Sequence, residues 1–122
     1  MGKAEVGKTG ENLACEFLKK KYYRIIERNY WKPWGEIDVI AKAPDGTLVF
    51  IEVKTLEHRS DNLELEPEDN LTAAKLKKLQ RTCQQYVLQK QKLIKEGRGW
   101  RIDLVALTIT NKDCIVRHYE NI

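Results

Sequence analysis

The chain has 122 residues, of which 42% are hydrophobic and 33% are charged, and this balance is typical of one folded domain, residues 1–122, rather than of a disordered chain. Its longest apolar runs fall far short of the roughly 20 residues that a membrane-spanning helix needs. The first residues lack the apolar core of a signal peptide, so we expect a cytoplasmic protein that contacts no membrane and whose Cys15, Cys83 and Cys114 are free thiols.

Charge is distributed unevenly along the sequence. Lysine and arginine total 22 against 18 aspartate and glutamate, which gives a net charge of +4. The acids concentrate at residues 63–69, whereas the bases concentrate at 17–24 and 75–81, and this separation predicts a basic face that suits a polyanion. The two histidines are far apart and no Cys-x-x-Cys is present, so we expect no zinc site.

The first predicted element is a helix. Apolar residues recur at helical spacing in TGENLACEFLKKK and predict a helix over about residues 5–21, with Thr9 as its N-cap and Glu11 in its first turn. Aromatic and β-branched residues then predict an edge strand over 22–31, which the sequence KPWG at 32–35 ends.

The rest of the chain alternates strands and one long helix. The expected elements are two strands flanking a turn at 43–47, a polar loop over 57–70, a helix over 71–96 that ends near Gly97 or Gly99, and strands over 100–109 and 114–122. The order α-β-β-β-α-β-β predicts a single-domain α/β sandwich with a mixed central β-sheet flanked by helices, in which the long helix crosses over the sheet.

The turn at 43–47 sets the register of the hairpin around it. Pro44-Asp45-Gly46 suits a three-residue loop in which glycine takes the left-handed position. Facing residues then have numbers that sum to 90, and the pairs on one side of the sheet are Ile40 with Phe50, Asp38 with Glu52, and Glu36 with Lys54.

Two carboxylates that face each other across a strand pair repel one another, and partial burial strengthens the repulsion. A divalent cation between Asp38 and Glu52 compensates for it, since Mg²⁺ prefers hard oxygen ligands and is often held by one or two carboxylates plus water and phosphate oxygens. Lys54 lies beside them, where an ammonium can orient or deprotonate a water, or stabilise a phosphorane-like transition state. The pattern therefore indicates metal-assisted phosphodiester hydrolysis.

A different interpretation of these charges is a cross-strand network of salt bridges on an open sheet face, with Glu36 paired to Lys54 and Glu52 paired to an arginine. Against it, Ile37, Val39, Val49, Ile51 and Val53 make the other side of the hairpin apolar as well. A strand that is apolar on both faces is typically central and covered, which places the acids at the mouth of a covered region.

The motif Gly35-Glu36-Ile37-Asp38, followed by a hairpin and Glu52-Val53-Lys54, resembles the PD-(D/E)XK nuclease superfamily. The whole chain resembles the YraN-like family of small bacterial restriction-endonuclease-like proteins, related in fold to archaeal Holliday-junction resolvases. Further matching segments are Gly7, Gly10 with Glu11, Ala14, Arg28-Asn29-Tyr30, Lys75 with Leu79, Arg101-Ile102-Asp103 and His118-Tyr119-Glu120-Asn121.

The resemblance implies roles for single residues. Asp38 and Glu52 would bind the metal, which is Mg²⁺ with Mn²⁺ as a substitute, and Lys54 would be the catalytic lysine. Glu11 would complete the catalytic and metal-binding site; an acid in the first turn of a helix is also favoured by the helix dipole alone. Glu36 is interpreted as a residue that supports the metal ligands without binding the metal itself, or as an ion-pair partner of Lys54.

Basic residues in two groups are the candidates for DNA binding: Lys19, Lys20, Lys21 and Arg24 near the end of the first helix, and Lys75, Lys77, Lys78 and Arg81 on the long helix. Solvation alone also accounts for such faces. Trp31, Trp34 and Tyr30 are compatible with stacking on unpaired bases or with a place in the core. Arg101 and Asp103 are expected to be structural, with Asp103 holding a basic neighbour.

This sequence departs from the family pattern at Trp31 and Leu56, where basic residues are usual, and in the acidic stretch 63–69. The departures concern the surface that would contact DNA. The resemblance implies a metal-dependent DNA endonuclease, selective for branched or junction DNA, with a homodimer as a further expectation because symmetric cutting needs two related sites. The alternative is a non-catalytic module on a nuclease fold that binds nucleic acid or a partner.

Overall fold

The order of helices and strands matches the expected order. The computed structural model describes residues 3–57 and 71–122, and the acidic stretch 63–69 lies outside them. The elements are α1 (Lys3–Lys20), β1 (Arg24–Lys32), β2 (Gly35–Lys42), β3 (Leu48–Glu57), α2 (Ala73–Gln89), a short 3-10 helix (Gln91–Leu93), β4 (Trp100–Ile109) and β5 (Cys114–Tyr119). No helix among these residues is long and apolar enough to cross a membrane.

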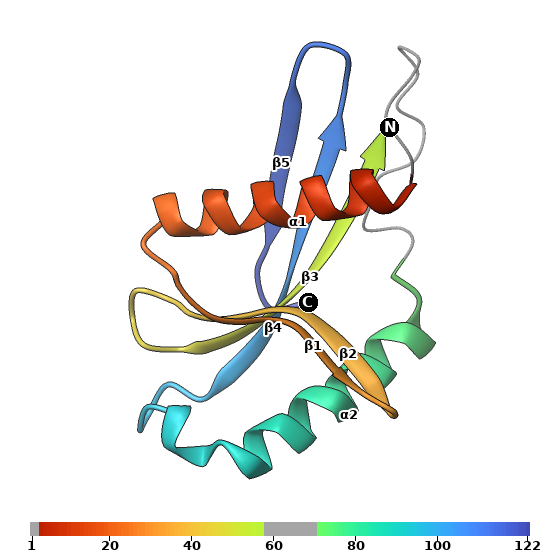
Figure 1. Ribbon diagram of the computed structural model, residues 1–122. Coiled ribbons are helices and arrows are strands. Elements are labelled where there is room, and N and C mark those ends of the chain that lie inside the picture. The colour runs from red at the N-terminus through yellow and green to blue at the C-terminus, as the bar shows by residue number, and fades with distance from the viewer. Residues whose placement is uncertain (1–2, 58–70) are drawn as a thin grey trace.

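The strands form one mixed sheet in the order β1-β2-β3-β4-β5, so β3 is the central strand, as its apolar faces predicted. β3 and β4 are parallel and the other neighbouring pairs are antiparallel. α1 packs over one face and α2 over the other (Figure 1). The mixed α/β sandwich is therefore confirmed.

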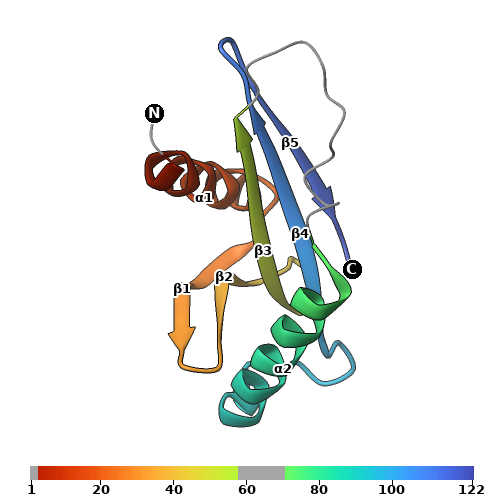
Figure 2. The same ribbon diagram turned by 90° about the vertical axis from the view of Figure 1, so that its right-hand side faces the viewer.

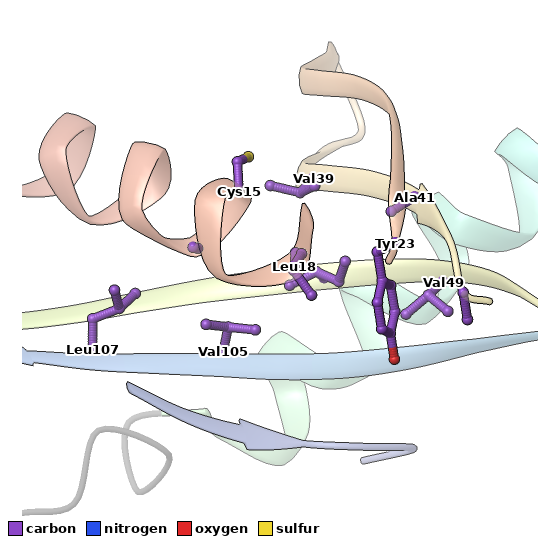
Figure 3. Close-up of a cluster of buried hydrophobic side chains, with 11 residues drawn as sticks. Cys15, Leu18, Tyr23, Val39, Ala41, Val49, Val105 and Leu107 are labelled. Atoms are coloured by element: carbon purple, nitrogen blue, oxygen red, sulfur yellow. The ribbon is translucent and has the colours of Figure 1, made fainter. Parts of the chain in front are cut away.

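Two clusters of buried side chains form the core. The first lies between α1 and the sheet, where Cys15 and Leu18 of the helix meet Val39, Val49 and other apolar side chains of the strands (Figure 3). The second lies under α2 and consists of Tyr30, Ile37, Ile40, Leu48, Phe50, Leu79, Cys83, Tyr86 and Ile102. Cys15 and Cys83 thus fill helix faces as small apolar residues, and all three cysteines are free.

The hairpin turn has the predicted geometry. The Ala43 N–H donates to the Thr47 carbonyl at 2.9 Å, and the Gly46 N–H donates back to the Ala43 carbonyl at 2.9 Å. Gly46 has φ 92°, a left-handed conformation that costs glycine little. The register follows as predicted over four pairs, from Lys42 with Leu48 to Val39 with Ile51.

The first part of β2, on the N-terminal side of Val39, is not paired with β3. β2 stays paired with β1 as far as Gly35, and β3 stays paired with β4 as far as Glu57, but pairing between β2 and β3 stops at Val39 and Ile51. Figure 2 shows the β1–β2 hairpin turning away from β3. We call the place where β2 and β3 part, around Asp38 and Glu52, the strand fork.

Two irregularities in β1 accompany the fork. The register between β1 and β2 shifts between Ile25 and Glu27, which is a β-bulge, and bulges bend a strand and increase its twist. Asn29 has φ 54° within the strand, and the β2 partners of its neighbours Arg28 and Tyr30 are the two residues that flank Asp38. Asparagine is one of the few side chains that tolerate this conformation.

Two predicted helix ends were wrong. α1 begins at Lys3, so Thr9 is inside the helix rather than at its N-cap, and Glu11 is eight residues from the start. The helix dipole, which acts on the first turn, therefore does not account for Glu11. α2 ends at Gln89 instead of near Gly97 or Gly99. The Lys90 N–H bonds to the Tyr86 and Val87 carbonyls as the chain turns into the 3-10 helix, and Leu93 and Ile94 then pack against the second cluster.

The conformation of Asn29 generates a stability prediction. Asn29→Val should destabilise the fold by about 1–2 kcal/mol, because a left-handed backbone is costly for a β-branched residue. Asn29→Gly should change stability much less, since glycine adopts this conformation freely. Urea unfolding of the three proteins gives the comparison, and equal losses in both variants would contradict the assignment.

Candidate active site at the strand fork

Asp38 is anchored by the fork itself. In an antiparallel ladder that follows the Ala43–Thr47 pair, hydrogen-bonded pairs recur every second residue, and the Val53 N–H would donate to the Ile37 carbonyl. Here the ladder has already ended, and the Val53 N–H donates to Asp38 Oδ2 at 2.8 Å. The carboxylate thus takes the place of a backbone acceptor and is held between the separating strands.

Glu52 follows Ile51, the last residue of β3 paired with β2. It lines a cavity of about 480 Å³ between the end of the β1–β2 hairpin and the first half of α2. Glu36 of β2 lines the same cavity, as do Lys75 and Lys78 of α2. The structure therefore brings two of the expected acids together with two of the expected DNA-binding lysines.

The expected alternation of sides holds only partly. Ile40 and Phe50 lie on one side of the sheet, as predicted, and that side faces α2; Ile37, which was expected on the opposite side, packs in the α2-side cluster as well. The pairs Asp38 with Glu52 and Glu36 with Lys54 are absent from the ladder between β2 and β3. The expected pairing was wrong here because the ladder between β2 and β3 ends at Val39 and Ile51, the residues next to Asp38 and Glu52.

Electrostatic interactions join these side chains despite the missing ladder. The pKa of Asp38 is raised to about 6, chiefly by burial, with the Val53 hydrogen bond opposing the rise, the charges of Glu11 and Glu36 adding to it and the Lys54 charge opposing it. The pKa of Glu52 is raised to about 8, chiefly by burial and then by the charges of Asp38 and Glu36, while the charges of Lys54 and Lys75 oppose the rise. The fork is thus a partly buried acidic cluster, and the positive charges of Lys54 and Lys75 offset only part of the rise in the pKa values of its acids.

Glu11 reaches this cluster from α1. Its Oε1 is buried, accepts no hydrogen bond among the described residues, and lies 3.6 Å from Arg28 Nε, which is an ion pair beyond hydrogen-bond length. Arg28 is engaged elsewhere, donating from Nη2 to Asn12 Oδ1 at 2.7 Å. Glu11 therefore has a buried oxygen that a cation would satisfy.

The interpretation of the hairpin charges as salt bridges finds no support. Over residues 3–57 and 71–122, the ion pairs join Glu11 to Arg28, Asp45 to Arg98, and Asp103 and Glu120 to Arg101, with His118 also on Asp103. None of them includes Glu36, Asp38, Glu52 or Lys54. The acids at the fork are therefore not explained as halves of structural ion pairs.

The donor set fits a hard divalent cation held by few protein ligands. The described residues contain no group of three or more His, Cys, Asp or Glu side chains close enough to hold a metal by themselves. Asp38 and Glu52, two carboxylates with raised pKa values, would suit Mg²⁺ or Mn²⁺ with water and phosphate oxygens completing the coordination, and the unsatisfied Glu11 oxygen is a further candidate donor.

The two groups of basic residues lie on different parts of the molecule. Lys75 and Lys78 line the cavity that contains Glu52, and Lys77 and Arg81 are exposed on the same helix. Lys19, Lys20, Lys21 and Arg24 are exposed where α1 meets β1, and Lys21 Nζ lies 2.9 Å from His118 Nδ1. The structure thus places the α2 group beside the fork but not the α1 group.

A second polar cluster lies at the C-terminal end of the chain. Asp103 is fully buried and accepts hydrogen bonds from Arg101 Nε at 2.9 Å and the Asn121 N–H at 2.9 Å, and it lies 2.8 Å from His118 Nε2. Burial by itself would raise the pKa of Asp103, but these partners hold it below its usual range. The expected structural roles of Arg101 and Asp103 are confirmed, whereas the part of His118 was missed because its partners lie far away in sequence.

Comparisons with known proteins give a consistent family. The model of the family described as "Uncharacterised protein family UPF0102" matches residues 10–107. A UPF0102 protein of Thermotoga maritima is 40% identical over 116 residues, covering 94% of each chain. UPF0102 proteins of Alkaliphilus oremlandii and Thermodesulfovibrio yellowstonii are 36% and 37% identical and cover at least 96% of both chains.

The raised pKa of Glu52 generates a prediction about pH. A carboxyl whose pKa rises on folding, here from 4.5 to about 8, stabilises the fold fully below the lower value and loses that contribution as the pH rises through the higher one. In the presence of a chelator, Glu52→Gln should therefore be more stable than wild type above about pH 8, by up to roughly 5 kcal/mol. The two proteins should converge at acidic pH.

Urea unfolding over a pH series measures this difference. Glu16→Gln, at an exposed position of α1, is the control with the same change of charge and should follow wild type. A Glu52→Gln protein that is no more stable than wild type at alkaline pH would show that the ionised Glu52 carboxylate does not destabilise the fold.

Proposed function

The chain belongs to the UPF0102 family, the YraN family that its sequence resembles, and we propose that it is a metal-dependent DNA endonuclease that hydrolyses phosphodiester bonds. The observation that carries the proposal is the strand fork, where burial raises the pKa of both Asp38 and Glu52, the charge of Asp38 adds to the shift of Glu52, and neither acid has an ion-pair partner among the described residues. Such an arrangement destabilises the metal-free protein and suits a bound divalent cation.

Asp38 and Glu52 are the residues that would hold the cation, with Glu11 as a third contributor. A divalent cation supplies a ligated water of lowered pKa and neutralises charge on a phosphate. Lys54 acts on both acids, since its charge lowers the pKa of each. In the proposed reaction its ammonium would orient the attacking water or stabilise the negative charge of the phosphorane-like transition state. Glu36 supports the site through its charge.

The lysines of α2 make the cavity suitable for a polyanion. Without Lys75 and Lys78, the acids of the cavity would repel a phosphate backbone; with them, phosphates can be neutralised beside Glu52. We propose branched or damaged DNA as the substrate in preference to plain duplex, and a homodimer where two strands are cut symmetrically.

One observation favours the alternative, a non-catalytic module that binds nucleic acid or a partner. The described residues hold no group of three metal-binding side chains, whereas the cavity itself combines basic and aromatic residues. The two functions differ in whether a strand is cut, because both predict salt-sensitive DNA binding.

Cleavage of labelled DNA tests the proposal. Wild type should cut flap or four-way-junction DNA in Mg²⁺ or Mn²⁺ and not in a chelator. Glu52→Gln and Lys54→Gln should each lose roughly 100-fold or more in rate, as expected when a group that acts in the transition state is removed.

Glu96→Gln, in the exposed segment after α2, provides the control with a matched change of charge and should cut like wild type. Binding of these DNAs without strand scission in either metal would reject the nuclease and favour the binding module.

A further inference from the structure

A second hollow adjoins the cavity of the fork. It has a volume of about 780 Å³ and is lined by Trp34 of the turn between β1 and β2 and by Lys77, Lys78, Arg81 and Gln84 of α2. Lys78 lines both hollows. The two therefore share a wall along α2, with Glu36 and Glu52 in the first and Trp34 in the second. We call the second one the tryptophan hollow.

The tryptophan hollow has positive charge without matching acids. Its lining contains three cations and no carboxylate. Among the ion pairs within the described part of the chain, none involves Lys77, Lys78 or Arg81. Cations gathered in this way attract an anion with several negative charges, such as a phosphate backbone.

Trp34 is both accessible and well positioned. It is 48% exposed, although large aromatic side chains in a domain of this size are usually covered. The next residue, Gly35, packs so closely on Thr82 of α2 that a Cβ at this position would collide with Thr82 Oγ1, and Thr82 Oγ1 in turn donates to the Lys78 carbonyl at 3.0 Å. The turn is thus docked on α2, which fixes the Trp34 backbone relative to Arg81.

An exposed indole beside unpaired cations has the chemistry of a single-strand site. An aromatic ring stacks on the face of a base while nearby lysines and arginines neutralise phosphates. In a continuous duplex each base face is covered by its neighbours, so a side chain can stack only on an unpaired or terminal base. A phosphate near Glu52 would place the adjoining nucleotides of the same strand towards the tryptophan hollow.

We propose that the tryptophan hollow binds an unpaired nucleotide of a single-stranded DNA arm, with its base on Trp34 and its phosphates on Lys77 and Arg81. The statement about the arm's place beside the cleaved bond rests on the proposed nuclease function. The substrate is then DNA in which a single-stranded arm adjoins the bond that is cut, as in a flap, rather than a fully paired four-way junction.

Fluorescence anisotropy in a chelator tests the binding part separately from catalysis. The probes are a labelled oligothymidylate and a labelled blunt duplex of the same strand length. Wild type should bind the oligothymidylate more tightly, and Trp34→Leu should weaken that binding roughly 5- to 100-fold, the range for loss of one stacked base. Trp34→Phe should retain most of the affinity because a ring remains.

Two further variants complete the test. Arg81→Gln should weaken oligothymidylate binding and lower the slope of log affinity against log salt by about 0.7, as loss of one phosphate contact on a single strand requires. Tyr22→Leu removes an aromatic ring that is 84% exposed beyond the end of α1 and should bind like wild type. Matching thermal unfolding curves for Trp34→Leu and wild type confirm an intact fold.

The outcomes separate this inference from the nuclease proposal. Unchanged oligothymidylate binding by Trp34→Leu, or tighter binding of the blunt duplex by wild type, would overturn the single-strand site even if metal-dependent cleavage is lost in Glu52→Gln. Binding that depends on Trp34 in a protein that cuts no DNA would support the site and reject the nuclease.

Discussion

The hydrogen bond from the Val53 N–H to Asp38 Oδ2 is the interaction on which the candidate site depends. It forms because β2 and β3 part after Val39 and Ile51, which leaves a backbone donor that would be costly to bury without an acceptor. The carboxylate supplies the acceptor, so the separation of the strands and the burial of Asp38 stabilise each other. Glu52 then lies where β2 has parted from β3, still paired with β4, and lines the cavity together with Lys75 and Lys78 of α2.

This arrangement lowers the stability of the metal-free fold. Burial and the charges of neighbouring acids raise the pKa of both Asp38 and Glu52. Lys54 only partly offsets this at both acids, and Lys75 only partly at Glu52. A core built for stability alone would have apolar residues there, continuing the cluster of Ile40 and Phe50. Sites that act on ligands commonly carry such a cost. Lys75 of α2 moderates the charge of Glu52, and in the proposed function the basic face of α2 would also present cations to a polyanion.

Much of this could be predicted from the sequence because local rules govern it. Pro44-Asp45-Gly46 determines its own turn and with it the register as far as Val39, and the two-sided apolar pattern of β3 predicts a central strand. The fork could not be predicted, because the bulge near Ile25 and the left-handed Asn29 are tolerated by their sequence rather than specified by it. The tryptophan hollow likewise depends on how the turn docks on α2, which is a tertiary contact.

The most direct test of the account is calorimetric titration of Mn²⁺ into wild type, Asp38→Asn and Glu52→Gln in the absence of DNA. The account predicts saturable binding to wild type, accompanied by release of protons from the two acids near neutral pH, and loss of most of that binding in both variants. Wild type that binds no Mn²⁺, or variants that bind it as tightly as wild type, would show that the fork is not a metal site and would contradict the central claim.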